Sequence, residues 1–463
     1  MKPTHAPVIA LAAAALLAAP APQAAAAPQG APALPAAKPA AAATPDYDGD
    51  GRADVAATMV DDQEFRFIRV WYGSGRVADI AHADLAADEY GIGLPLLARD
   101  LNGDGYTDLV ASSSASSKVT VHLIPGSAAG LQATSRHSFV VLTKAKSHLQ
   151  SLALVESPVR RLAVSTSTYI ETSKGVRYDD QVLLYKLTGA GLPTGSPVKL
   201  APGSGKVPAA MKGDFGGAMD SWGSQLFIGA PGAKVNGKSQ AGTVAVVTLN
   251  SAGVKSVKRI TQATRSVTGA VDKYDYFGNA VVARDGYLVV GTPGDHVGKV
   301  KRTGSIQVFS LSKGKVKPVK RISQNSAGIP GKAERLDRFG GHLAIGATCD
   351  GVPAVLVGGT GEAISKGHEG DGSAWLIPLR KAKGCAATQL YEGHGLPGKP
   401  DYRGIGDLLA FLRNRGEVAD DLVIGGGGSF SEGPLGRIFR VSAKTGKATK
   451  LNPDDIFGAV TGR

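Results

Sequence analysis

Short apolar segments alternate with glycine-rich turns along most of the chain. The stretch "GTVAVVTLNSAGVKSVKRITQ", which starts at Gly242, contains runs of strand length and shows no helical period. It aligns without gaps on "GSIQVFSLSKGKVKPVKRISQ", which starts at Gly304, at a shift of 62 residues. The same shift carries Phe215-Gly216 onto Phe277-Gly278 and that pair onto Phe339-Gly340. A fixed period of this length indicates one supersecondary unit copied along the chain.

Each copy of this unit predicts four antiparallel strands. The order is a Phe-Gly start, an apolar strand, a second strand ending in glycine, a variable polar loop, a third strand and a basic segment. Seven units, the third of them the weakest, start near residues 46, 100, 149, 213, 275, 337 and 404. At about 60 residues each, they have the size and number of blades that close into a ring. We therefore expect an all-β fold, a seven-bladed β-propeller of four-stranded antiparallel blades, over residues 46–463.

The N-terminal segment has a different pattern. Lys2 and His5 precede an apolar run from Val8 to Ala19, and the alanines at 24–27 offer a small-residue cleavage site. This pattern predicts a secretory signal peptide over residues 1–27. Residues 28–45 form an Ala/Pro-rich tract that predicts an extended linker. No later run reaches the roughly 18 apolar residues of a membrane span, so we expect a secreted protein, extracellular or associated with the cell surface.

Composition adds constraints on partners. The chain has 62 Gly, 26 Pro and only 6% aromatic residues, which is typical of a turn-rich β-protein. Its net charge of +13 favours contact with anionic surfaces or polysaccharides, although solvated loop charges are the simpler explanation. Aromatic residues are not interleaved with the basic ones, which argues against nucleic acid. The two cysteines, Cys349 and Cys385, form either one disulfide or two buried thiols, because sequence gives no distance.

Two stretches, "DYDGDGRADV" at 46–55 and "DLNGDGYTDL" at 100–109, place acidic or amide side chains at every second position. With a glycine at position 6 and a free carbonyl at position 7, this is how a loop wraps Ca²⁺. Alanine replaces the bidentate Glu of an EF-hand at position 12, and strands follow, so the loops belong to a β-protein. A metal-free Asp/Gly turn is the alternative. The expected ligands are Asp46, Asp48, Asp50, the Arg52 carbonyl and Asp54, and then Asp100, Asn102, Asp104, the Tyr106 carbonyl and Asp108.

The repeated motifs resemble a known family. "FGGAMDSWGSQLFIGAPG" at 215–232 and "FGNAVVARDGYLVVGTPG" at 277–294 are similar to FG-GAP repeats, and the first two units resemble the calcium-loop variant called VCBS-type. The resemblance implies the seven-bladed propeller of the integrin α-subunit head and of secreted bacterial proteins, with a role in adhesion or binding. Integrin-type propellers carry Asp-rich loops in later blades. Here only Asn414 and Asp420 keep part of that pattern, so we expect metal in blades one and two alone.

No catalytic motif accompanies these repeats: G-x-S-x-G, H-E-x-x-H and Cys/His clusters are all absent from the sequence. His296 and His368 fall in loops, where chance explains them best. We therefore favour a binding or adhesion module for an extracellular protein or glycan over an enzyme. The alternative is an extracellular hydrolase or lyase acting on an anionic polysaccharide, in which separated acids such as Asp295 and Glu369 meet. Two carboxylates, or Arg, Tyr and His, around one channel mouth would favour that alternative.

Overall fold

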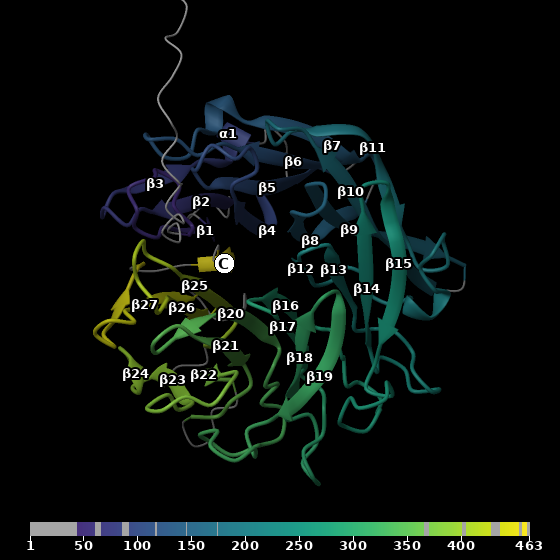
Figure 1. Cartoon of the computed structure of the whole chain (residues 1–463), viewed down its shortest axis with the longest axis vertical. Coiled ribbons are helices and arrows are strands. Elements are labelled where there is room, and N and C mark those ends of the chain that lie inside the picture. The colour runs from purple at the N-terminus through teal and green to yellow at the C-terminus, as the bar shows by residue number, and fades with distance from the viewer. Residues whose placement is uncertain are drawn as a thin grey trace, which may run out of the picture. The chain divides into compact units, whose positions relative to one another are not determined.

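The strands of the unit Ala40–Arg463 form seven separate small sheets, arranged in a ring (Figure 1). The computed structural model describes residues 44–60, 66–85, 92–115, 118–144, 146–173, 175–364, 370–400, 404–426, 436–452 and 456–460. In this part of the chain six sheets have four strands and one has five. The predicted all-β, seven-bladed β-propeller is confirmed. The predicted signal peptide and residues 28–43 of the predicted linker lie outside the described residues.

The blades follow one another along the chain. Blades one to three contain β29 (Ile456–Val460), β1 (Val55–Val60), β2 (Arg66–Trp71) and β3 (Val77–Ile80), then β4 (Ile92–Arg99), β5 (Asp108–Ala115), β6 (Lys118–Ile124) and β7 (His137–Leu142), then β8 (Ser147–Val155), β9 (Arg161–Thr172), β10 (Gly175–Leu187) and β11 (Pro193–Leu200). Blades four and five contain β12 (Met219–Trp222), β13 (Gln225–Ala230), β14 (Thr243–Asn250) and β15 (Gly253–Ile260), then β16 (Val281–Arg284), β17 (Tyr287–Thr292), β18 (Ser305–Ser312) and β19 (Lys315–Ile322).

Blade six contains β20 (His342–Thr348), β21 (Val352–Gly359), β22 (Ser373–Pro378), β23 (Thr388–Glu392) and the short parallel β24 (Gly395–Leu396), and blade seven contains β25 (Leu408–Leu412), β26 (Asp421–Gly426), β27 (Arg437–Val441) and β28 (Ala448–Lys450). Helical segments in the described residues are limited to α1 (His82–Leu85), η1 (Ala133–Ser135) and η2 (Ala209–Met211). None of them is long or apolar enough to cross a membrane.

The ring closes because a strand near the end of the chain pairs with the first strand described. β29 lies against β1, with Ala57 opposite Val460 and Met59 opposite Ile456, so the last strand of the chain completes the first blade. The first unit starts near residue 46 in the sequence, and its innermost strand comes from the C-terminal end of the chain. Propellers protect most of their strand edges by closing in this way.

One strand from each blade faces the axis of the ring. β4, β8, β12, β16, β20, β25 and β29 contact one another in this order, and β29 returns to β4. The predicted basic segments become β15 and β19, which are the outermost strands of blades four and five. Exposed lysines along these edges oppose pairing with another chain. Part of the positive charge therefore has an architectural explanation.

Neighbouring strands within a blade are antiparallel, so successive connections lie at opposite ends of the ring. One end carries the connections from first to second and from third to fourth strand, and we call it the hairpin face. The other end carries the longer connections, from second to third strand and from blade to blade, such as 261–280, 293–304 and 323–341. We call it the long-loop face.

The phenylalanines of the Phe-Gly pairs fill the space between blades. Phe215, Phe277 and Phe339 are all fully buried within apolar clusters that join adjacent sheets. Gly278 has φ 92°, and a Cβ atom there would lie 2.7 Å from the Thr243 carbonyl oxygen. Only glycine combines this backbone conformation with so close an approach.

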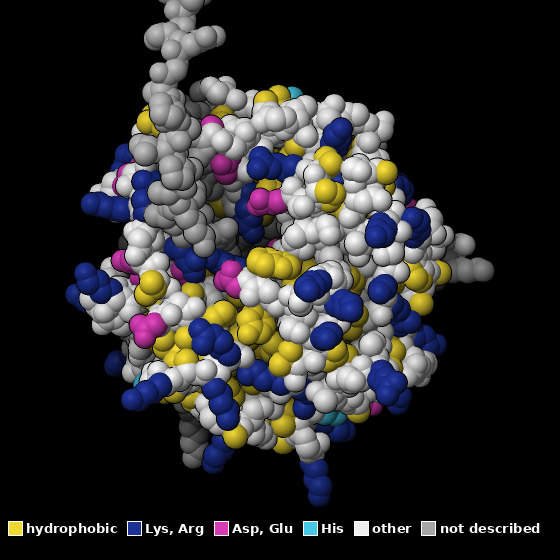
Figure 2. All heavy atoms as spheres, in the orientation of Figure 1, with side chains coloured by type: hydrophobic (Ala, Val, Ile, Leu, Met, Phe, Trp, Pro, Cys, Tyr) yellow, Lys and Arg dark blue, Asp and Glu magenta, His cyan; other side chains and the backbone are white. Residues whose placement is uncertain are grey.

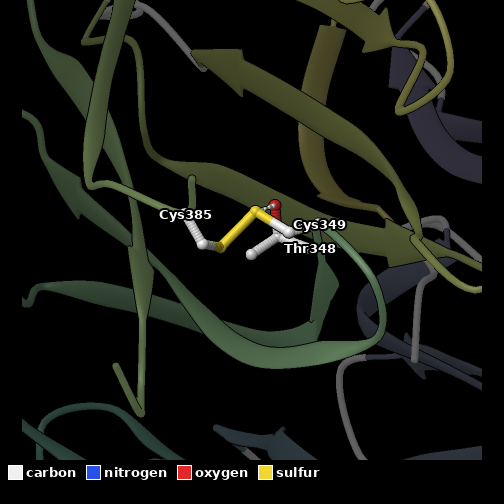
Figure 3. The surroundings of a disulfide bond; sticks show 3 residues. All are labelled: Thr348, Cys349 and Cys385. Atoms are coloured by element: carbon white, nitrogen blue, oxygen red, sulfur yellow. Dashed lines mark hydrogen bonds between the residues drawn. A yellow bond between two sulfur atoms is a disulfide. The ribbon is translucent and has the colours of Figure 1, made fainter. Parts of the chain in front are cut away.

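Cys349 and Cys385 form a disulfide, so of the two possibilities left open by the sequence the bonded one is present (Figure 3). Their Cα atoms lie 6.1 Å apart, and 36 residues separate them in the chain. The bond ties the turn after β20 to the segment before β23, both within blade six.

Candidate functional site

The first Asp-rich loop lies on the hairpin face, directly before β1. Asp46, Asp48 and Asp50 each contribute one carboxylate oxygen to a group whose members lie within 4.8 Å of one another. Asp46 is 3% exposed, and its Oδ1 atom has no hydrogen-bond partner. Burial raises the pKa of Asp46, while the N–H groups of Gly51 and Gly49 oppose the shift. A buried oxygen without a partner is costly, and a hard cation bound by three carboxylates would relieve the cost. The residues present therefore fit Ca²⁺.

The second loop, between β4 and β5 on the same face, has a matching backbone. The N–H groups of Gly103 and Gly105 donate to Asp100 at 2.6 and 3.2 Å, and the N–H of Asp104 donates to Asn102 at 2.9 Å. The three side chains at positions 1, 3 and 5 remain solvent-accessible. The Asn102 amide also donates to Asp104 at 2.9 Å, in the place where the first loop has a third carboxylate. This loop offers two carboxylates and one amide.

The acid at position 9 of each loop has a structural role, with or without an ion. Asp54, Asp108 and, at the same place in blade seven, Asp421 begin or immediately precede the second strand of their blades. Burial raises the pKa of Asp54 to about 7 and that of Asp108 to about 6, against two backbone N–H donors each. The donors are Tyr47 at 2.6 Å and Gly73 at 2.8 Å for Asp54, Leu101 at 2.8 Å and Gly126 at 3.0 Å for Asp108, and Ala443 at 2.8 Å for Asp421.

Blade seven shows what replaces the metal-binding pattern. Its loop between β25 and β26 carries Arg413 where the first two loops have their first aspartate. The Arg413 Nε atom donates to Asp420 at 2.6 Å, and Asn414 accepts the N–H of Ala53 at 2.9 Å. Asn414 and Asp420, the two residues that kept part of the ligand pattern, are thus used in protein contacts. In this loop the Arg413 guanidinium, rather than a metal ion, provides the positive charge beside the carboxylate of Asp420.

Removing the acids of the first loop is expected to abolish the part of the stabilisation by calcium that this loop supplies. At free Ca²⁺ one hundred times the dissociation constant, binding adds about 2.7 kcal/mol to the free energy of unfolding. Thermal melts of the wild type in Ca²⁺ and in chelator should differ, and this difference should be clearly smaller for Asp46→Asn/Asp48→Asn, which keeps only the second loop. Asp350→Asn, on the same face but outside both loops, is the matched control and should respond like the wild type. Identical wild-type melts in Ca²⁺ and chelator would identify the loop as a metal-free turn.

Two adjoining cavities open on the long-loop face. A cavity of about 480 Å³ lies over the axis and is lined by Gln150, Asn279, His342 and Asp407, among others. A second, of about 370 Å³, lies between blades five and six and shares Asn279, Gly341 and His342 with the first. His342 Nε2 lies 2.9 Å from Asp407 Oδ1. Burial acts to raise the pKa of Asp407, but the His342 hydrogen bond holds it below its usual value.

The pocket between blades five and six brings together residue types that the sequence analysis named as a group. Tyr276, Arg302, Arg338 and His342 all line it. The first two come from the long connections around blade five and the last two from the entry to blade six. No motif marks these residues in the sequence. Only an alignment of the repeats could have pointed to the two arginines. Arg302 lies two residues before the repeated glycine, and Arg338 lies one residue before the repeated phenylalanine.

The axial space continues to the hairpin face as a cavity of about 490 Å³. Arg99, Glu156, Asp220, Trp222 and Arg284 line it, and Figure 2 shows acidic, basic and hydrophobic side chains together around a central hollow. Asp220 accepts the N–H groups of Ser221 and Ala283, each at 2.8 Å, and so joins the inner strands of blades four and five. The axial cavities at the two ends share an apolar ring of Leu152, Met219, Val282, Leu343 and Leu409.

The loop acids and histidines named from the sequence do not form a catalytic group in the described residues. Asp295 is 4% exposed and pairs with Arg321 at 2.6 Å. His296 Nδ1 lies 3.2 Å from the Gly294 carbonyl oxygen. His368 and Glu369 lie outside the described residues.

The sheets define a seven-bladed β-propeller with two Asp-rich loops at one end of the ring. Residues 46–111 match the family model described as FG-GAP-like repeat. The match confirms the FG-GAP resemblance over the first blade and the start of the second, and the seven-bladed ring fits the propeller of the integrin α-subunit type. A comparison with curated proteins finds no match.

Among solved structures, the chain is similar to a protein provisionally assigned as a 6-phosphogluconolactonase from Bacteroides uniformis, with 9% identity and a TM-score of 0.49 over 89% of this chain and 99% of the other. It is also similar to puromycin hydrolase, with 12% identity and a TM-score of 0.43 over 90% of this chain and 57% of the other. Likenesses at these values carry no argument about activity.

Proposed function

We propose that the protein is a secreted, calcium-stabilised propeller that acts as a binding or adhesion module for an extracellular glycan or protein through its long-loop face. A propeller with an FG-GAP repeat supports a module of the binding type. Cavities open at both ends of the ring. The observation that carries the choice of face is the pocket that gathers Tyr276, Arg302, Arg338 and His342 at the end with the longest connections. Loops held by a rigid scaffold are where binding residues concentrate.

The second candidate function is an extracellular hydrolase or lyase acting on an anionic polysaccharide. It is favoured by one observation, the approach of Tyr276, His342 and two arginines in one pocket, with His342 oriented by Asp407. Tyr and His are residues that transfer protons in catalysis, and Arg stabilises negative charge. The binding function needs fewer assumptions because it requires no particular protonation state.

One experiment separates the two candidates. Protein from residue 28 onward is incubated in Ca²⁺ with a panel of extracellular polysaccharides, and both retained protein and released oligosaccharide are measured. We expect retention by at least one polysaccharide without release. Release of oligosaccharide would establish the enzyme instead, and absence of both retention and release across the panel would contradict the glycan form of the proposal.

A further inference from the structure

Three junctions between neighbouring blades are built in the same way. At each of them a glycine before the third strand of one blade forms a parallel bridge with the residue that opens the next blade. The bridged pairs are Gly242 with Phe277, Gly304 with Phe339 and Gly372 with Ile405. The crossing therefore brings two segments of the long-loop face side by side at equivalent positions of the repeat.

Besides the bridging glycine, two other positions at each crossing share a positive φ angle. One lies two residues before the bridging glycine, and the other lies one residue before the bridged partner. The pairs are Gln240 (54°) with Tyr276 (57°), Arg302 (56°) with Arg338 (57°), and Gly370 (106°) with Gly404 (58°). Glycine adopts positive φ freely, whereas a residue with a Cβ atom pays for it in free energy. The third junction therefore has the residues that the backbone prefers.

The junction between blades five and six is the one that places an arginine at both positions. The fold does not require arginine here, because glycine adopts the same positive φ at the equivalent positions of the next junction, Gly370 and Gly404. The two arginines also place like charges in one pocket. Arg302 and Arg338 thus occupy strained backbone positions, and such strain is found most often where residues contact a ligand.

The surroundings of the two arginines leave both guanidinium groups available. Both side chains are exposed, and in the described part of the chain neither forms an ion pair. The Arg302 guanidinium lies 5.3 Å from the centre of the Tyr274 ring. Both arginines line the pocket of about 370 Å³, together with Tyr276, Asn279, His342 and Thr360, and no acidic side chain lines it.

We propose that this pocket binds the carboxylate or sulfate group of an acidic sugar. An arginine offers parallel N–H donors that match the oxygens of either group, and two arginines from adjacent segments can hold one group from both sides. The Tyr276 hydroxyl and the Asn279 amide supply hydrogen bonds for sugar hydroxyls. The inference rests on the proposed function and names the ligand class of the same face.

The test uses Arg302→Gly/Arg338→Gly in the full mature protein. Glycine relieves the backbone, so the variant should melt at or above the wild-type temperature. Binding to immobilised heparin, which is sulfated, to polygalacturonate, which is carboxylated, and to neutral dextran is measured at fixed salt. We expect wild-type binding to at least one of the two anionic probes and a loss of at least tenfold in the variant. Lys255→Ala/Lys317→Ala, which removes two charges from the outer edges of blades four and five, should change binding less than twofold.

The outcomes separate this inference from the proposed function. Unchanged binding of the arginine variant to the anionic probes, or an equal loss in the lysine control, would overturn the pocket and leave the binding module standing. Wild-type binding to dextran alone would overturn the acidic-sugar chemistry and still support a glycan module. Absence of wild-type binding to all three probes would overturn the inference, and the wider polysaccharide panel then decides the proposed function.

Discussion

Replacing Phe339 by alanine is expected to lower the free energy of unfolding by about 3–5 kcal/mol. Phe339 is fully buried, and its ring lies 5.1 Å from that of Trp375 in an edge-on contact. It packs in a cluster that contains Ile306 and Val308 of blade five and Val355 of blade six. Truncation would therefore leave a cavity between two blades that the rigid sheets cannot close.

Denaturant unfolding of the Phe339→Ala variant measures this loss. Val418→Ala is a suitable control because its apolar side chain is 65% exposed, and we expect a change below about 0.5 kcal/mol. A Phe339→Ala protein as stable as the wild type would contradict the assignment of the Phe-Gly motif to architecture. It would also weaken the interpretation that the repeated phenylalanines hold neighbouring blades together.

Removing the disulfide is expected to have the second largest effect. The bond closes a loop of 36 residues within blade six. In the chain-entropy model such a bond stabilises by between about 3 kcal/mol, the value for a 15-residue loop, and about 4.7 kcal/mol, the value for a 100-residue loop. Cys349→Ala/Cys385→Ala should therefore unfold at clearly lower denaturant concentration than the wild type.

The same double variant provides its own control. Under reducing conditions the wild type should approach the stability of Cys349→Ala/Cys385→Ala, while the variant itself should be insensitive to reductant. Equal stability of the oxidised wild type and the variant would show that the bond forms without constraining blade six.

Much of the fold could be predicted because the repeat is local. Gly242 and Gly304 immediately precede matching strands 62 residues apart, and each unit makes most of its own hydrogen bonds within one blade. The closure of the ring could not be predicted in this way. The pairing of Met59 with Ile456 joins residues almost 400 positions apart, and nothing in either strand alone names its partner.

The candidate site was predictable only in part. Each Asp-rich loop is one contiguous stretch of sequence. Spacing alone therefore identifies Asp46, Asp48 and Asp50 as candidate metal ligands whose carboxylates lie close together. Spacing does not show that Asp54 turns both oxygens toward backbone N–H groups, because its donor Gly73 follows a different strand. The pocket between blades five and six forms where segments 293–304 and 323–341 lie side by side. A motif within one segment cannot show which other segment lies beside it.

The central claim is that the long-loop face binds the ligand. Hydrogen exchange of the mature protein with and without a retained polysaccharide tests it most directly, because backbone protection reports which loops are covered. We predict slower exchange in 261–280, 293–304 and 323–341, and unchanged exchange in the hairpin-face loops 46–54, 100–107 and 413–420. Protection confined to the hairpin-face loops would place the ligand at the opposite end of the ring and contradict the account.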